Sequence, residues 1–325
     1  MKALFLGNPG PFAARPLWEW LSAGHGVGEF WCARSASDRQ WRRDKRLGRV
    51  RPGWSVTAAL KKYDVAMRIV GNPRDEFDLV VKAVGLRADV LLSAGFRYII
   101  PSSLLAIYGE GAVNFHPTLL PQYRGPQPLP WMLLNGETES CGGVTGHVMW
   151  PEVDAGSIVA QRRVPWPVGG TFGKWQLELC RAAGAIAATE LVDYFDGKLA
   201  SQPQSGTSSY FGVFPRDRLI LDETLSAHVI EQRLAALGTY RPLLVKSARG
   251  TIRVRHSYGV IGPRTGMPPA VTFRSVDFDT SDARVRASRW MPGTSKITRA
   301  QTWLHYALTA PAAAAAVDLR SNQAA

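Results

Sequence analysis

Short apolar runs alternate with segments of helical periodicity over the first 200 residues. Such alternation is typical of a parallel α/β sheet whose strands are joined by helices. Helices are predicted at Ala13–Ala23, Glu76–Leu86 and Thr171–Phe195. The apolar runs predict strands at Lys2–Leu6, Glu29–Ala33, Val65–Val70, Val90–Ser93, Ala112–Phe115, Val144–Trp150 and Ile158–Val164.

The pattern changes after the long helix. Asp196–Ser209 is polar and contains Gly, Pro, Gln and Ser, as an inter-domain linker does. A short helix near Ser226–Leu237 and several short strands separated by Gly and Pro turns follow, which favours a small β-barrel. We therefore predict an α/β domain at 1–200, a β-rich domain at 210–310 and a low-complexity tail at 311–325.

Composition agrees with a globular protein of about two domains. The chain has 325 residues, of which 46% are hydrophobic and 20% charged. Its three cysteines are scattered, so neither a disulfide framework nor a CxxC zinc pair is indicated, and a cytoplasmic location is expected. The chain contains no apolar run of about 18 residues, so no membrane span is predicted.

The charge is strongly basic, with 39 Lys and Arg against 26 Asp and Glu. Arg34–Arg51 holds eight basic and two acidic residues and no apolar periodicity, so we predict an exposed loop or a frayed helix there. Such a charge attracts nucleic acid, phosphorylated substrates or an anionic surface, and it also aids solubility. The charge alone does not separate these interpretations.

The candidate chemistry lies between Ser93 and Gln161. Asn114 and His116 end a predicted strand and would project from one face of it. An Asn amide can stabilise an oxyanion, a His can move a proton near neutral pH, and the loop carboxylate of Asp154 can orient that His. The same residues also suit structural roles. Asp-Ala-Gly, for example, is a common turn sequence. The spacing of His116, His147 and Asp154 matches no short zinc motif, so no metal is predicted.

Four blocks in this region resemble the folate-dependent formyltransferase family. They are NFHPTLLPQYRG, NGETE, GVTGH and EVDAGSIVAQ, in that order. The resemblance implies a Rossmann-like, mostly parallel catalytic domain followed by an OB-like barrel. It also implies N10-formyltetrahydrofolate as formyl donor, tetrahydrofolate as product, and direct attack by a substrate amine.

The family's catalytic Asn, His and Asp fall on Asn114, His116 and Asp154. Three further residues, Arg124, Gln127 and His147, are implied as acceptor contacts, although loop structure or packing would explain them equally. The folate pocket of the family falls on two segments, with contacts at Phe96, Tyr98, Ile99, Ile100, Trp150, Pro151, Glu152 and Val153.

The acceptor is less well defined than the chemistry. We expect a small anionic amine, such as that of a nucleotide-linked amino sugar, because His147 and DAGSIVAQ resemble the sugar enzymes. Methionyl-tRNA is the main competing acceptor, which the basic stretch and the C-terminal barrel favour. A natural-product amine or hydroxylamine, hydrolysis of the donor, and a non-catalytic binding protein with this fold stay open, as does a homodimer.

Overall fold

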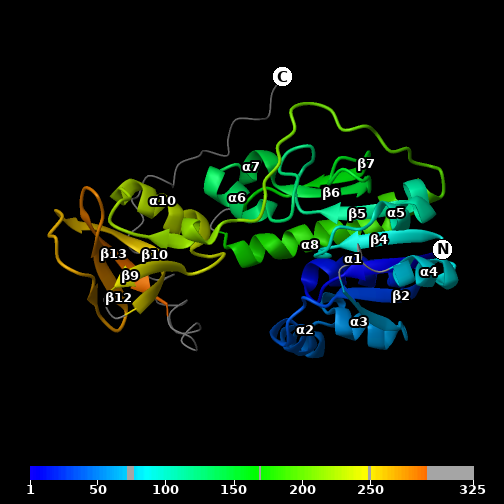
Figure 1. Ribbon diagram of the computed structural model, residues 1–325, viewed down its shortest axis with the longest axis horizontal. Coiled ribbons are helices and arrows are strands. Elements are labelled where there is room, and N and C mark those ends of the chain that lie inside the picture. The colour runs from blue at the N-terminus through cyan, green and yellow to red at the C-terminus, as the bar shows by residue number, and fades with distance from the viewer. Residues whose placement is uncertain (72–76, 168–169, 248–249, 291–325) are drawn as a thin grey trace, which may run out of the picture.

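A computed structural model describes residues 1–71, 77–167, 170–247 and 250–290, and it contains two β-sheets (Figure 1). The larger sheet has the order β3-β2-β1-β4-β5-β6-β7. Its first five strands run parallel, whereas β6 and β7 are antiparallel additions. The strands are β1 (Lys2–Gly7), β2 (Gly26–Ala33), β3 (Met67–Val70), β4 (Val90–Ala94), β5 (Ala112–His116), β6 (Gly143–Val148) and β7 (Ile158–Arg163).

Both faces of this sheet are covered at its centre, which explains why strands such as β1 and β4 are largely apolar. In β1, Ala3 and Phe5 belong to one buried cluster, while Leu4 and Leu6 belong to another. Successive side chains of a strand point to opposite faces, so each cluster marks one face. Helices α1 (Pro11–Ser22) and α8 (Phe172–Ala188) pack together on the first face. Helices α4 (Phe77–Leu86) and α5 (Ser102–Tyr108) cover the second.

Two helix predictions need correction. The helix predicted at Thr171–Phe195 is divided, because Thr189 leaves helical geometry between α8 and α9 (Glu190–Phe195). The basic stretch is not a loop or a frayed helix, since Asp38–Val50 forms helix α2. A reciprocal capping box between Ser37 and Gln40 begins this helix.

Buried Asp44 explains why α2 is ordered without an apolar stripe of its own. Its carboxylate accepts hydrogen bonds from Ser55 Oγ at 2.8 Å, from Val56 N at 3.0 Å and from Thr57 N at 2.9 Å. These groups lie at the start of helix α3 (Val56–Lys62), which follows the 3-10 turn Pro52–Trp54. Asp44 therefore joins α2 to α3 through a satisfied polar contact.

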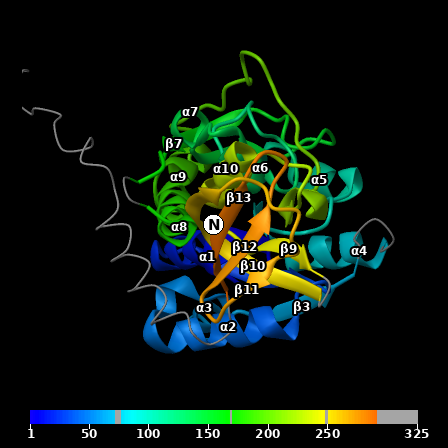
Figure 2. The same ribbon diagram turned by 90° about the vertical axis from the view of Figure 1, so that its left-hand side faces the viewer.

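The second sheet has six strands in the order β11-β12-β13-β10-β9-β8 and forms a half-barrel (Figure 2). Helix α10 (Ala227–Leu237) packs on β10 and buries Ile230 and Leu234. The predicted β-rich, barrel-like second domain is thus confirmed. Its strands are β8 (Ile220–Leu221), β9 (Leu243–Ser247), β10 (Gly250–Gly262), β11 (Ala270–Val271), β12 (Ser275–Asp279) and β13 (Arg284–Arg289).

The two domains are joined by the chain from 196 to 219, and they also contact each other directly. Phe172 N donates to Thr239 Oγ1 at 3.1 Å, and the Phe172 ring packs edge-on against Tyr240. The predicted tail at 311–325 lies outside the described residues, as does the end of the predicted 210–310 domain. No helix within the described part of the chain is long and apolar enough to cross a membrane.

Candidate active site

The end of β5 brings two of the predicted catalytic residues to the same face. Strand β5 lies between β4 and β6 and pairs antiparallel with β6, so that Asn114 stands opposite His147. Asn114 Nδ2 lies 3.2 Å from His147 Nε2. His147 Nδ1 donates to the Val148 carbonyl at 2.9 Å, which leaves Nε2 to accept from the amide when the ring is neutral.

His116 is buried and has an oxygen acceptor beside each ring nitrogen. Its Nε2 lies 2.8 Å from the carbonyl oxygen of Tyr123, and its Nδ1 lies 3.5 Å from Oδ2 of Asp154. Tyr123 reaches this position because its backbone is in the left-handed region at φ 59°. A second proton on the imidazole would therefore be shared with an acceptor on either side.

Asp154 joins the two histidines. Its Oδ1 lies 3.5 Å from His147 Nε2, and its Oδ2 accepts a hydrogen bond from Gly125 N at 2.8 Å. The residue has φ 54°, a conformation that Asp tolerates better than most residues. The structure thus gathers Asn114, His116, His147 and Asp154 into one cluster, which we call the catalytic cluster.

Burial and charge set the protonation of the catalytic cluster. Burial lowers the pKa of His116, while the nearby carboxylate of Asp154 opposes this shift. Burial alone would raise the pKa of Asp154, but His116, His147 and the Gly125 amide together hold that pKa below its ordinary value. The resting cluster therefore combines an ionised carboxylate with an imidazole that can accept a proton.

The NGETE block supports the loop that carries Tyr123. The Tyr123 hydroxyl donates to Glu137 Oε2 and accepts from Asn135 Nδ2 at 2.9 Å. On the other side of the loop, Thr145 Oγ1 accepts from Leu120 N at 3.1 Å and donates to a main-chain carbonyl. These contacts fix the backbone that faces His116.

The segment predicted as a plain linker forms hydrogen bonds with this loop and with the backbone around Asp154. Gln204 Nε2 donates to the carbonyl oxygens of Asp154 and Gly156, both at 2.8 Å. Gln204 Oε1 accepts from Arg124 Nη2 at 2.7 Å and from its Nε at 3.2 Å. Sequence reasoning missed Gln204, because its polar neighbourhood indicated only an exposed connection.

The segment that joins the two domains also forms hydrogen bonds with two residues predicted to contact the acceptor. The Arg124 backbone pairs with Ser209 and Phe211, and Gln127 Oε1 accepts from Phe214 N at 2.9 Å. Gly125 has φ 110°, and a Cβ there would lie 2.2 Å from the Phe211 carbonyl oxygen, so only glycine fits. Arg124 and Gln127 therefore have structural partners within the described residues.

The predicted folate contacts lie on two segments connected to the cluster. Phe96, Tyr98, Ile99 and Ile100 follow β4, whose Ser93 pairs with Asn114. Phe96 and Ile100 pack into the second core cluster, whereas Ile99 is 48% exposed.

The second predicted folate segment runs from Trp150 through Pro151 and Glu152 to Val153, immediately before Asp154. Trp150 is 56% exposed. A Cβ on Gly156 would come within 2.3 Å of the Trp150 ring and 1.9 Å of the Val148 carbonyl oxygen, so glycine lets the indole lie against this backbone.

A second polar corner lies two strands from β5, at about 10 Å by strand spacing. Asn8, which follows β1, is 7% exposed, and its Oδ1 accepts from Ala33 N at 3.2 Å. Its Nδ2 has no hydrogen-bond partner among the described residues. Helix α1 begins just beyond, at Pro11, and its N-cap residue Gly10 provides no side-chain cap. This corner therefore offers donors of the kind that hold anions.

Two pockets are hollowed elsewhere in the described structure. One, of about 290 Å³, lies between α2, α3 and β3. The other, of about 920 Å³, is bordered by the end of β7 and by α8, and its arginines are paired with Glu190, Glu178 and main-chain carbonyls. Neither is lined by a member of the catalytic cluster. No group of three potential metal ligands with suitable geometry occurs among the described residues.

The fold and the cluster define a class of protein. It is an α/β domain with an Asn, a His and an Asp gathered at the carboxyl end of a central strand of a mostly parallel sheet. The Formyl transferase family model matches residues 54–174 of this chain.

Curated relatives match about half of the chain. The methionyl-tRNA formyltransferase of Roseiflexus sp. (strain RS-1) is 37% identical over 158 residues, 48% of each chain. That of Listeria monocytogenes serotype 4a (strain HCC23) is 36% identical over 158 residues, 48% of this chain and 50% of its own. This chain therefore spans about half the length of the curated relatives it matches.

Solved structures extend the likeness to both domains, as fold alone. The N-formyltransferase from Helicobacter canadensis, solved with folinic acid and dTDP-3-aminofucose, gives a TM-score of 0.60 at 15% identity and covers 89% of this chain and 100% of its own. HypX from Aquifex aeolicus gives 0.59 at 18% identity and covers 91% of this chain and 48% of its own.

Proposed function

We propose that this protein transfers a formyl group from N10-formyltetrahydrofolate to the amine of a small anionic substrate, with Asn114, His116 and Asp154 as catalytic residues. The observation that carries the proposal is the catalytic cluster, in which a neutral amide donor, a buried imidazole and an ionised carboxylate meet within hydrogen-bonding or ion-pairing reach. The match of the Formyl transferase family model to residues 54–174 supports the same reaction.

The residues around the cluster suit a flat donor with an apolar ring. Ile99, on the segment that follows β4, and Trp150, on the segment just before Asp154, both expose large apolar surfaces. Gly156 lets the Trp150 indole lie against the backbone, because any side chain at this position would clash with the ring. When bound, the folate supplies an activated formyl carbonyl, and these residues would hold its ring.

Asn114 would stabilise the negative charge that develops on the formyl oxygen. Its Nδ2 is held near His147 Nε2, so the amide is already oriented before substrate binds. His116 adds a second donor once it is protonated, because the Tyr123 carbonyl and Asp154 support that proton. Preorganised donors of this kind contribute about 2.7–4 kcal/mol each to lowering a barrier.

Asp154 would control the protons. The attacking amine must lose a proton as the new C–N bond forms, and the ionised carboxylate is the nearest base to both histidines. Its lowered pKa keeps it ionised at neutral pH. No covalent enzyme intermediate is required, since the amine attacks the formyl carbon directly.

The polar corner beside the cluster supports an anionic acceptor. The unpartnered Asn8 Nδ2 and the uncapped start of α1 would bind a phosphate, at about 10 Å from β5. This span suits a substrate that carries its amine and its phosphate at opposite ends, such as a nucleotide-linked amino sugar. Binding of such a substrate is the finer part of the proposal.

Methionyl-tRNA is a second candidate acceptor, and a specific observation favours it. Helix α2 carries six Lys and Arg whose side chains have no ion-pair partner among the described residues. Such a helix would attract RNA phosphates. The names of the relatives from Roseiflexus and Listeria agree with this candidate.

The test is an acceptor panel that follows tetrahydrofolate release from N10-formyltetrahydrofolate. We expect release only with amino-sugar nucleotides, and its loss in Asn114→Ala, His116→Ala and Asp154→Asn. Release only with methionyl-tRNA would select the second candidate. Release without any amine would indicate a hydrolase, and binding of folate without release under any condition would contradict the catalytic proposal.

A further inference from the structure

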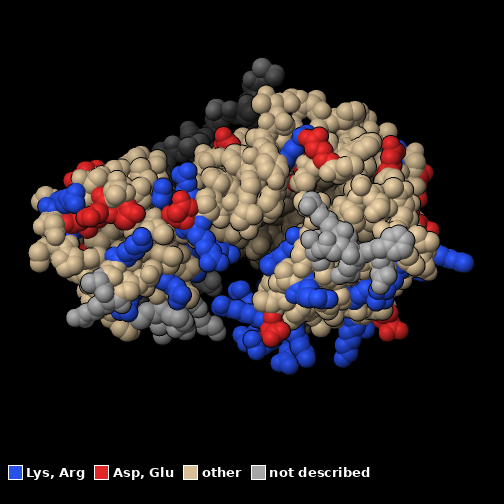
Figure 3. All heavy atoms as spheres, in the orientation of Figure 1, with Lys and Arg blue, Asp and Glu red and all other residues tan. Residues whose placement is uncertain are grey.

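Helix α2 presents an unusual excess of positive charge. Arg39, Arg42, Arg43, Lys45, Arg46 and Arg49 are all exposed, and their side chains have no ion-pair partner in the described part of the chain. Asp44 does not offset them outward, because its carboxylate is turned inward and bonded to the start of α3. Figure 3 shows these basic side chains gathered below the α/β domain, where Figure 1 draws α2.

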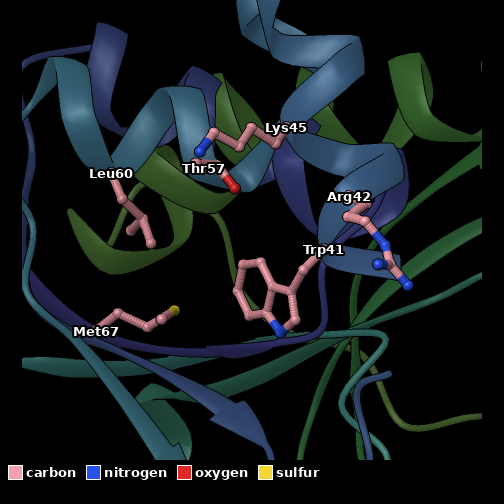
Figure 4. A pocket seen from close by; sticks show the side chains of 6 residues that line it. All are labelled: Trp41, Arg42, Lys45, Thr57, Leu60 and Met67. Atoms are coloured by element: carbon pink, nitrogen blue, oxygen red, sulfur yellow. The ribbon is translucent and has the colours of Figure 1, made fainter. Parts of the chain in front are cut away.

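A pocket of about 290 Å³ opens between this helix, α3 and the edge strand β3. Its volume is at the lower end of the range for small-molecule sites. The flat indole of Trp41 forms one wall, and Leu60 and Met67 lie opposite it (Figure 4). An aromatic face opposed by a thioether and a methyl-bearing side chain fits a planar ring.

The border of the pocket is charged. Lys45 comes from α2 and places its ammonium at the rim, beside Thr57 of α3, whereas Arg42 turns its guanidinium away on the other side of Trp41 (Figure 4). A ligand that fills the apolar slot and also pairs with Lys45 must join a planar ring to an anionic group.

We propose that this pocket is an accessory binding site for a nucleotide, with the base between Trp41 and Met67 and the phosphate on Lys45. A nucleotide combines a planar ring with a multiply charged anion at short range, which matches the two parts of the pocket. Base stacking on Trp tolerates all bases, so the site selects the nucleotide class more than one base.

The site is separate from the catalytic cluster. Strand β3 is four positions from β5 in the sheet, about 19 Å by strand spacing. A nucleotide bound there cannot occupy the acceptor position, so this inference does not rest on the proposed reaction.

The test is equilibrium binding by titration calorimetry on the full chain. Adenosine and uridine monophosphates, their nucleosides and inorganic phosphate are the probes. We expect both monophosphates to bind at least tenfold more tightly than either part alone. A site that binds phosphate as tightly as the nucleotide, or that binds only RNA oligonucleotides, would contradict the proposal.

Paired variants localise the binding. Lys45→Gln and Arg49→Gln each remove one charge from α2, but only Lys45 lines the pocket. We expect Lys45→Gln to weaken nucleotide binding about tenfold and Arg49→Gln less than twofold. Met67→Glu adds a like charge at an exposed position and should abolish this binding event, whereas His116→Asn should preserve it. Equal effects of the two α2 variants would mean non-specific attraction and overturn the site.

Discussion

Polar side chains in the catalytic cluster are bonded to other protein groups, whereas most of those on the basic helix α2 extend to the surface. Around the cluster, almost every side chain has a partner, since Asp154 is held by Gly125 N and by two histidines, and its carbonyl by Gln204. On α2, only Asp44 is bonded inward, and six cations extend to the surface. The first arrangement is preorganised for chemistry, and the second is open to a ligand.

The largest expected effect comes from removing His116 from the centre of the catalytic cluster. His116→Ala removes the group that shares a proton between Asp154 and the Tyr123 carbonyl. We expect kcat to fall about 10²- to 10³-fold in a formyl-transfer assay. The exposed His228→Ala is the control and should retain full turnover, because His228 lies on α10 in the second domain. A fall of less than tenfold in His116→Ala would exclude His116 as a catalytic residue.

A glycine pair tests how tightly the loop is built. Gly125→Ala places a Cβ 2.2 Å from the Phe211 carbonyl oxygen, so the loop must shift and release Asp154. We expect the free energy of unfolding to drop by about 3 kcal/mol, with a loss of activity. Gly206→Ala has a similar positive φ but meets nothing within 4 Å, and it should cost about 1 kcal/mol. Denaturant titration measures both, and equal losses would contradict the close approach.

Gln204 tests whether the chain joining the domains positions Asp154. Gln204→Leu removes two donated and two accepted hydrogen bonds, and we expect kcat to fall about tenfold with little change in KM. Gln204→Glu keeps the acceptor for Arg124 but loses the donors, so it should resemble Gln204→Leu. Gln202→Leu, at an exposed side chain on the same segment, should match wild type. A change confined to KM would assign Gln204 to binding instead.

The smallest expected effect is a dependence of stability on pH. The pKa of His116 is lowered by burial, so the folded state binds fewer protons than the unfolded chain just below the ordinary His pKa of about 6.5. Stability should therefore fall as the pH drops through about 6.5 toward the lowered folded pKa. His25 and His256 act in the same direction. The share due to His116 is the slope that disappears in His116→Asn, measured by denaturant titration between pH 5 and 8 and compared with His228→Asn.

Much of the fold could be predicted from the sequence. Each strand predicted in the first domain is present, with shifted ends, because apolar runs buried on both faces give a strong local signal. Helix α2 could not be predicted as an ordered element, because it depends on Asp44 reaching the start of α3, a contact between residues 11 to 13 apart. The break at Thr189 could not be predicted either, since the surrounding residues favour helix throughout.

The candidate site likewise contains residues that could be predicted from the sequence and residues that could not. Asn114, His116 and Asp154 could be proposed because they fall in blocks that resemble a known family. The contacts of Gln204 could not, because it lies 50 residues from Asp154 and in a segment whose composition indicates only a linker. Arg124 and Gln127 remain predicted acceptor contacts, although the structure gives each a partner in that segment.

The most direct test of formyl transfer to an acceptor amine is to follow the formyl carbon itself. N10-formyltetrahydrofolate labelled with ¹³C at the formyl group is incubated with the protein and an amino-sugar nucleotide, and the products are separated by mass spectrometry. We expect the label to appear as a formamide on the acceptor with wild type and not with Asn114→Ala or Asp154→Asn. Label recovered only as formate, or equal labelling of the acceptor by all three proteins, would contradict this expectation.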